Sequence, residues 1–84
     1  MIKYLERDLV KEISGKRVIV DFYADWCGPC RMQGEILKDF NTVDVIKVDV
    51  DKYSDIAKQY GIMSIPTLIL FDNGKLIKSH TKYP

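Results

Sequence analysis

Apolar residues follow two spacings along the chain, one typical of strands and one typical of helices. Short apolar runs rich in β-branched residues predict strands at residues 1–5, 17–23, 43–50, 67–71 and 76–79. Between them, apolar residues recur three and four positions apart, which predicts helices over residues 6–14, 29–40 and 53–60. The order β-α-β-α-β-α-β-β predicts an α/β domain with a mixed central sheet of four or five strands flanked by helices.

Local signals indicate where these elements begin and end. Pro29 suits the first position of the second helix, because its missing N–H would have no partner there. Gly61 is expected to end the third helix, and Asp72-Asn73-Gly74 predicts a turn between the last two strands. On the second helix, the residues expected to share one apolar face are Met32, Ile36, Leu37 and Phe40.

Cys27 and Cys30 are the only cysteines, and they lie between a predicted strand and a predicted helix. Unpaired N–H groups and the helix dipole at that junction favour a thiolate over a thiol. We therefore expect Cys27 to be the nucleophile and the more exposed sulfur, and Cys30 to attack the mixed disulfide. The alternatives are weaker: a structural zinc site needs four ligands and only His80 could join the pair. A structural disulfide across so short a loop would stabilise little.

Residues 18–40 and 45–74 resemble thioredoxins, in the family's order and close to its spacing. The motifs that carry the resemblance are Val20-Asp21-Phe22, Trp26-Cys27-Gly28-Pro29-Cys30-Arg31-Met32, Lys47, Tyr60-Gly61-Ile62 and Ile65-Pro66-Thr67. The resemblance implies a thioredoxin fold and a thiol–disulfide oxidoreductase that reduces protein disulfides through Cys27 and Cys30. Two positions depart from the family: Glu35 replaces a frequent proline, and Tyr23 replaces a frequent tryptophan.

Asp21 is an acid within an otherwise apolar strand. Burial would raise the pKa of its carboxyl group and let it exchange protons near neutral pH. The resemblance implies that Asp21 lies under Cys30 and takes its proton, and that Lys47 on the adjacent strand pairs with it. The alternative is an exposed acid at the edge of a strand.

The resemblance also implies a substrate-binding surface around Cys27. It implies a cis peptide bond before Pro66, which would turn the backbone of Ile65 toward an extended substrate peptide. Trp26 would serve as an exposed apolar platform, although a buried core aromatic is the alternative. The complete expected substrate-binding set is Trp26, Gly28, Pro29, Gly61, Ile62, Ile65 and Pro66.

Length and charge exclude several classes of protein. Eighty-four residues make one domain, residues 1–84, and the net charge of +1 offers no basic stripe for nucleic acid. Apolar runs such as residues 68–71 are too short to span a membrane, and Glu6-Arg7 comes too early for a signal peptide. We therefore expect a cytoplasmic protein with neither metal nor cofactor beyond the Cys27–Cys30 disulfide.

The expected partners are disulfide-containing proteins as substrates and a thioredoxin reductase as electron donor. The Gly28-Pro29 insert resembles the reducing members of the family. The alternatives are an oxidase or isomerase, and a thioredoxin-fold module that binds a partner without turnover. Residues 80–84 are too few for the family's final helix. We therefore expect an uncovered sheet face, formed by Leu68 and Leu70 or by Ile69 and Phe71, and self-association through it.

Overall fold

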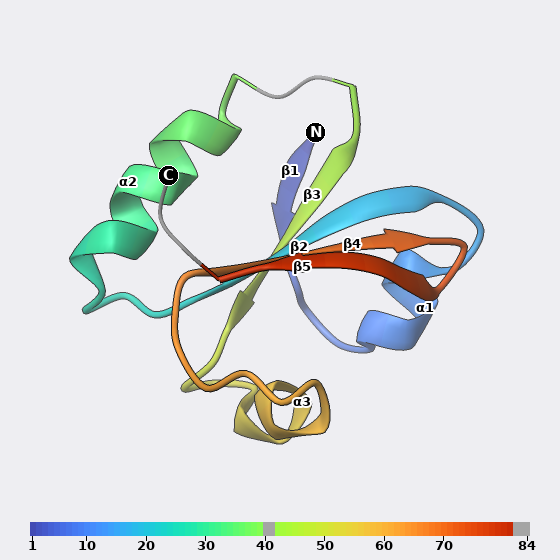
Figure 1. Ribbon diagram of the computed structural model, residues 1–84. Helices are drawn as coiled ribbons and strands as arrows, with labels where there is room; N and C mark the ends of the chain where they lie inside the picture. The colour runs from blue at the N-terminus through green and yellow to red at the C-terminus, as the bar shows by residue number, and fades with distance from the viewer. Residues whose placement is uncertain (40–41, 82–84) are drawn as a thin grey trace.

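The computed structural model describes residues 1–39 and 42–81 of the chain (Figure 1). Its elements follow the predicted order: β1 (Ile2–Tyr4), α1 (Leu9–Ile13), β2 (Arg17–Tyr23), α2 (Gly28–Leu37), β3 (Asp44–Asp49), α3 (Ser54–Gln59), β4 (Thr67–Asp72) and β5 (Lys75–His80). Phe40, which we expected on the second helix, lies outside the described residues. No helix among the described residues is long and apolar enough to cross a membrane.

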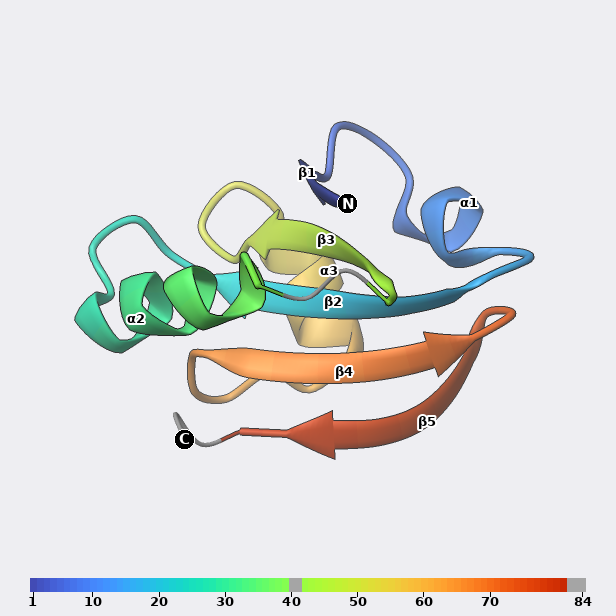
Figure 2. The same cartoon turned by 90° about the horizontal axis from the view of Figure 1, so that it is seen from above.

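The five strands form one mixed sheet with the order β1-β3-β2-β4-β5, as predicted for the thioredoxin fold. β1 and β2 pair with β3 in parallel, whereas β4 pairs antiparallel with both β2 and β5. α2 lies on one face of the sheet, and α1 and α3 lie on the other (Figures 1 and 2). The central strand β2 therefore carries residues toward both layers of helices.

The main core lies between the sheet and the layer formed by α1 and α3. Successive side chains of a strand point to opposite faces, so Val18, Val20 and Phe22 of β2 all enter this core and are fully buried. The ring of Tyr60 packs between Phe22 and Phe71, with centroids 6.3 and 5.6 Å apart. Burying each such side chain stabilises the fold by about 1.5–3 kcal/mol.

The first helix is shorter than the predicted span of residues 6–14. It begins after Asp8, whose side chain accepts a hydrogen bond from the backbone N–H of Val10 and caps the helix. It ends before Gly15, which has a positive φ of 75°. The chain before Asp8 extends from β1 and places Leu5 in the core ahead of the helix.

The prediction of which α2 residues face the protein interior is partly wrong. Met32 and Ile36 are 54% and 38% exposed, whereas the buried residues of the helix are Cys30, Gln33 and Leu37. The disulfide sets which face of the helix is buried, because Cys27 caps α2 and its bond to Cys30 holds Cys30 inside. Positions 33 and 37 lie three and seven residues after Cys30, on the same face of the helix, and are therefore buried with it. Met32 and Ile36 consequently lie outside the packed face.

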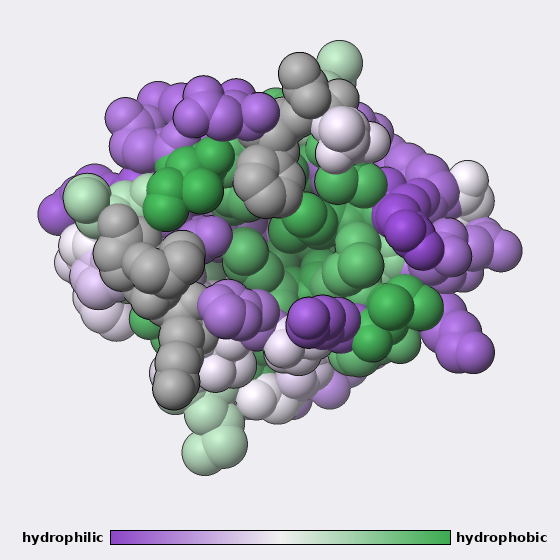
Figure 3. Space-filling model, turned by 45° about the horizontal axis from the view of Figure 1, so that its top comes forward, coloured by the Kyte–Doolittle hydropathy of each residue, from purple (hydrophilic) through white to green (hydrophobic). Residues whose placement is uncertain are grey.

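Leu68 and Leu70 of β4 point to the face of the sheet on which α2 lies, whereas Ile69 and Phe71 enter the main core. The sequence had left this choice open. Leu68 and Leu70 are half-buried and line a shallow cavity of about 100 Å³ together with Ile19. Apolar side chains are accordingly visible near the centre of this face in Figure 3.

Candidate active site

Cys27 caps α2 directly after the turn that follows β2. Its backbone is extended, with φ −90° and ψ 110°, and its Sγ accepts a hydrogen bond from the backbone N–H of Cys30 at 3.1 Å. A second bond, from the N–H of Cys27 to the carbonyl of Ala24 at 3.1 Å, holds the turn. The predicted strand-to-helix junction is therefore present, and Pro29 occupies the second rather than the first helical position.

Cys27 and Cys30 form a disulfide, with their Cα atoms 5.2 Å apart. Both residues are buried, and Cys27 is the more exposed of the two, at 5% against 2%. They form a small cluster with Ala24, against which Tyr23, Val50 and Ile65 pack. Cys27 is thus the less deeply buried sulfur, at the start of the helix, as predicted.

Asp21 is fully buried on β2, which excludes the alternative of an exposed acid at a strand edge. Neither oxygen of its carboxylate has a hydrogen-bond partner among the described residues. Burial raises the pKa of Asp21 above its usual value, and Lys47 opposes this rise. Asp21 is therefore a buried group that accepts a proton more readily than an exposed carboxylate does.

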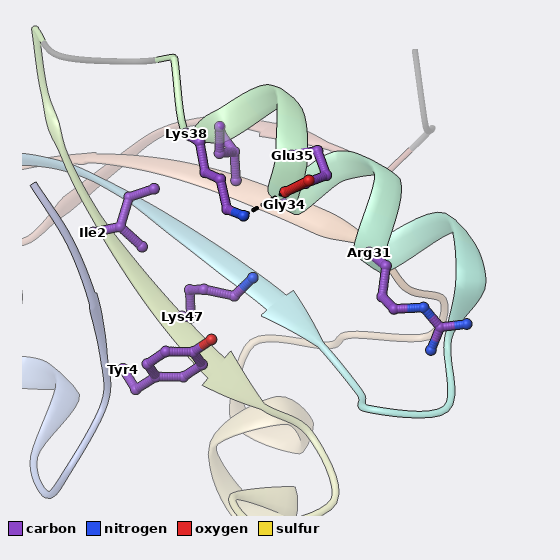
Figure 4. A pocket seen from close by; sticks show the side chains of 8 residues that line it. Ile2, Tyr4, Arg31, Gly34, Glu35, Lys38 and Lys47 are labelled. Atoms are coloured by element: carbon purple, nitrogen blue, oxygen red, sulfur yellow. Dashed lines mark ion pairs between the residues drawn. The ribbon is translucent and has the colours of Figure 1, made fainter.

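Lys47 on β3 lies directly across from Asp21 in the sheet register, with its Nζ 3.4 Å from the Oδ2 of Asp21. Figure 4 shows that its side chain points toward α2, close to Tyr4 of β1. Lys47 and Cys30 also line one cavity of about 150 Å³. Lys47 thus connects the buried acid with the side of the site that holds the second cysteine.

Tyr23, which replaces the family's frequent tryptophan, lies beside this pair. The Nζ of Lys47 is 4.7 Å from the centroid of its ring, within the range of a cation–π contact. Burial, followed by the charges of Asp49 and Asp25, raises the pKa of Tyr23 to about 12. The phenol therefore stays neutral at physiological pH and contributes an apolar and aromatic wall.

Trp26 is 69% exposed and is thus a surface aromatic rather than a core residue. Its indole N–H donates a hydrogen bond to the Oδ2 of Asp51 at 2.8 Å, which fixes the orientation of the ring. A shallow groove of about 200 Å³ begins at this ring. The residues that line it are Trp26, Val50, Ile62, Met63, Ser64 and Ile65.

This groove brings together three residues of the predicted substrate-binding set, Trp26, Ile62 and Ile65. The other four lie around it rather than in it. Gly28 and Pro29 form the first turn of α2, Gly61 follows α3 with a φ of 65°, and Pro66 is buried behind Ile65.

The Ile65–Pro66 peptide bond is cis, as the resemblance implied. The turn that contains it is closed by the hydroxyl of Thr67, which donates a hydrogen bond to the carbonyl of Ser64 at 2.7 Å. Ile65 packs against the disulfide cluster, so this loop forms the second wall of the site, opposite the first turn of α2.

Three residues of the site, Asp51, Val50 and Met63, are not among those predicted from the sequence. Because β2 and β3 run parallel and end at the same edge, with Tyr23 opposite Asp49, the residues that follow them meet there. A prediction of that register would have placed Val50 and Asp51 beside Trp26. Met63 is 95% exposed, and its only signal was an apolar residue inside the loop before Pro66.

Within residues 1–39 and 42–81, no three His, Cys, Asp or Glu side chains cluster so that they could hold a metal ion. The chemistry that the site itself displays is the opening and closing of a disulfide. A disulfide whose first cysteine caps a helix, an apolar groove beside it, and a buried acid on the adjoining strand together define a thiol–disulfide exchange site on a mixed α/β sheet.

Comparison with known proteins agrees with this class. Residues 3–83 match the thioredoxin family. The chain is 48% identical to the thioredoxin of Alicyclobacillus acidocaldarius over 73 residues, which are 81% of this chain and 70% of that protein. It is 51% identical to a thioredoxin-like protein of Synechocystis over 67 residues, 74% of this chain and 64% of the relative. The matched part thus spans about two thirds of the length of these relatives.

The solved structures give the same result. A mutant thioredoxin from Halobacterium salinarum superposes with a TM-score of 0.87 at 35% identity, covering 99% of this chain and 79% of the other. The chain belongs to the thioredoxin family. Family membership and the Cys27–Cys30 disulfide together support thiol–disulfide oxidoreductase activity at this site.

Proposed function

We propose that this chain reduces disulfide bonds in other proteins by dithiol–disulfide exchange. The observation that carries the proposal is the position of the Cys27–Cys30 pair, capping α2 beside an open apolar groove. In this position Cys27 is the less deeply buried sulfur and the one that a substrate would reach first, and Cys30 is within bonding distance of it.

In the reduced protein, the thiolate of Cys27 attacks one sulfur of a substrate disulfide. A bond forms between the two proteins, and the second substrate sulfur leaves as a thiolate that takes a proton from solvent. The N–H of Cys30 donates a hydrogen bond to the Sγ of Cys27, and the dipole of α2 favours negative charge at the same end of the helix.

The second exchange releases the substrate. Asp21 takes the proton of the Cys30 thiol, and the resulting thiolate attacks the Sγ of Cys27. The Cys27–Cys30 disulfide forms, the bond to the substrate breaks, and the second substrate thiolate leaves and is protonated. Two electrons have then moved from the Cys27–Cys30 dithiol to the substrate. Lys47, 3.4 Å from Asp21, offsets the charge of the buried carboxylate before it accepts the proton.

The groove between Trp26 and Ile65 binds the substrate chain. Its apolar walls suit a peptide whose polar backbone pairs with exposed backbone at Ile65, while its side chains contact the ring of Trp26 and Ile62. Gly28 and Pro29 leave the approach to Cys27 free of bulky side chains, and Gly61 and Pro66 shape the loop on the other side.

A thioredoxin reductase is the proposed electron donor, because reduction of the Cys27–Cys30 disulfide requires two electrons from outside the chain. A relative in Mycobacterium leprae, 43% identical over 70 residues, is named a bifunctional thioredoxin reductase/thioredoxin, so one chain there carries both parts. A matching structure from yeast concerns resolution of a mitochondrial peroxiredoxin by glutathione/thioredoxin systems, which supports disulfide-containing proteins as substrates.

We propose that residues 1–84 act as one domain in the cytoplasm. There the chain carries electrons from its donor to protein disulfides and so contributes to cell redox homeostasis. Its proposed partners include no metal, nucleic acid or membrane. Reduction of insulin by dithiothreitol tests the proposal. We expect the chain to accelerate precipitation of the insulin B chain. A binding module without turnover would leave the uncatalysed rate unchanged.

A further inference from the structure

The geometry points to Tyr4 as a positioning residue that holds the ammonium group of Lys47 against Asp21 and so favours transfer of the Cys30 proton. The role of this proton transfer in catalysis rests on the proposed function. The positioning of Lys47 itself concerns only the side chains of Tyr4, Lys47 and Asp21. From the sequence we expect Tyr4 to be a packing residue only, and it lies at the edge of the sheet rather than at the disulfide.

The sheet register places the three side chains in one row. Tyr4 of β1 is directly opposite Lys47 of β3, and Lys47 is directly opposite Asp21 of β2. Neighbouring residues across paired strands point to the same face, so all three project toward α2. Lys47 is therefore between an aromatic ring on one side and a buried carboxylate on the other.

Two aromatic rings attract the ammonium while it remains paired with Asp21. Its Nζ is 5.8 Å from the centroid of Tyr4, 4.7 Å from the centroid of Tyr23 and 3.4 Å from the Oδ2 of Asp21. The rings of Tyr4 and Tyr23 are themselves in edge contact, with centroids 6.1 Å apart. Because these contacts exist together in one conformation, the rings favour the paired position of Lys47 over positions that extend into solvent.

α2 closes the remaining side. A Cβ on Gly34 would lie 3.1 Å from the Nζ of Lys47, so the helix leaves room for the ammonium and little more. Figure 4 shows Lys47 and Tyr4 on one side of a cavity of about 380 Å³ and the helix on the other. The side chain of Lys47 is consequently only 14% exposed, although Tyr4 itself is 61% exposed.

The charged and titratable groups around Lys47 define what a change at Tyr4 can affect. α2 contributes Arg31, Glu35 and Lys38 to the same cavity, and Glu35 is paired with Lys38. β2 contributes Asp21 and Tyr23, and β1 contributes Tyr4. Asp25 lines a second cavity together with Lys47, and Lys38 and, more weakly, Lys47 lower the pKa of Glu35. Among the described residues, Asp21 is the only one of these acids that forms an ion pair with Lys47, so loosening Lys47 acts first on Asp21.

The test compares Tyr4→Leu, which removes the ring, with Tyr4→Phe, which keeps it. The oxidised protein, labelled with ¹³C at aspartate carboxyl groups, is titrated by NMR, and Asp21→Asn assigns the signal. We expect the titration midpoint of Asp21 to rise by about half a pH unit in Tyr4→Leu and to stay unchanged in Tyr4→Phe. This readout needs no turnover, so it remains valid if the protein proves not to be a reductase.

A double-mutant cycle shows whether the effect passes through Lys47. In a Lys47→Met background, Tyr4→Leu should cause no further change in the midpoint. The inference is overturned if Tyr4→Leu shifts the midpoint equally in the Lys47→Met background, or if Tyr4→Phe shifts it as much as Tyr4→Leu does. It is also overturned if Tyr4→Leu leaves the titration midpoint of Asp21 unchanged or lowers it. If the proposed function also holds, Tyr4→Leu should slow single-turnover insulin reduction about threefold at pH values below the titration midpoint of Asp21. Tyr4→Phe should leave this rate unchanged.

Discussion

The Nζ of Lys47 and the Oδ2 of Asp21 lie 3.4 Å apart across paired strands, and Asp21 is fully buried. Burial raises the pKa of Asp21 more than this pair lowers it. The charged form of Asp21 is therefore less stable in the folded protein than in the unfolded chain, even with Lys47 present. This relationship links the stability of the fold to the proton transfer proposed for the second exchange.

The first prediction concerns stability in Asp21→Asn. Between the pKa of Asp21 in the unfolded chain and its raised pKa in the folded protein, the folded state binds more protons. The free energy of unfolding contributed by this group therefore falls as pH rises through that window, by up to about 1.4 kcal/mol per pH unit, and is constant outside it. Asp21→Asn should lack this fall and be at least as stable as the wild type at pH 7.

Urea unfolding between pH 4 and pH 9 measures this difference. Asp72→Asn is the matched control, since its carboxylate is half exposed and forms only a surface pair with Arg17 at 3.5 Å. The control should keep the pH dependence of the wild type. Parallel stability curves for Asp21→Asn and the wild type would show that Asp21 does not titrate differently on folding.

The second prediction separates the two cysteines. Cys27→Ser should abolish disulfide reduction, because it removes the sulfur at the accessible start of α2. Cys30→Ser should instead leave a mixed disulfide that persists, because the sulfur that resolves it is gone. Mass spectrometry after incubation with a labelled disulfide detects the trapped species. Faster alkylation of Cys30 than of Cys27 in the reduced protein at pH 7 would reverse the assigned roles.

The sequence predicted the order of elements because strands and helices carry different apolar spacings, and β2 was predicted with its observed bounds. It placed Cys27 correctly at the helix terminus. The inward face of α2 was partly wrong because it depends on the disulfide and not on the apolar residues Met32 and Ile36. The contact between Trp26 and Asp51 was missed because it depends on the register of two strands, which local patterns do not determine.

The third prediction concerns Asp51→Ala. Loss of the hydrogen bond should free the exposed ring of Trp26, increase KM for insulin several-fold and change the free energy of unfolding by less than about 1 kcal/mol. Trp26 is the only tryptophan, so time-resolved fluorescence anisotropy reports its motion directly. Asp39→Ala removes an equal charge from an exposed position and should leave KM and anisotropy unchanged. An unchanged anisotropy decay in Asp51→Ala would mean that Asp51 does not hold the ring.

The fourth prediction concerns Gly34→Ala within α2. Alanine favours a helix interior over glycine by about 0.5–1 kcal/mol. The added Cβ would lie 3.1 Å from the Nζ of Lys47, which is held between Asp21 and two aromatic rings, so displacing Lys47 should offset this gain. Thermal or urea unfolding should therefore show no gain or a small loss. Gly15→Ala should destabilise, because Gly15 has a positive φ of 75°. A gain of the full amount, about 0.5–1 kcal/mol, in Gly34→Ala would mean that Lys47 moves aside freely and is not held against Asp21.

The central claim is that the Cys27–Cys30 pair works as a reductant, and its reduction potential tests this most directly. The protein is equilibrated with glutathione redox buffers, and the oxidised fraction is measured by alkylation and mass spectrometry. We predict a potential more negative than about −250 mV, at which the dithiol can donate electrons to protein disulfides in a reducing compartment. A potential between about −120 and −180 mV, the range of disulfide-forming and disulfide-isomerising proteins, would contradict the account.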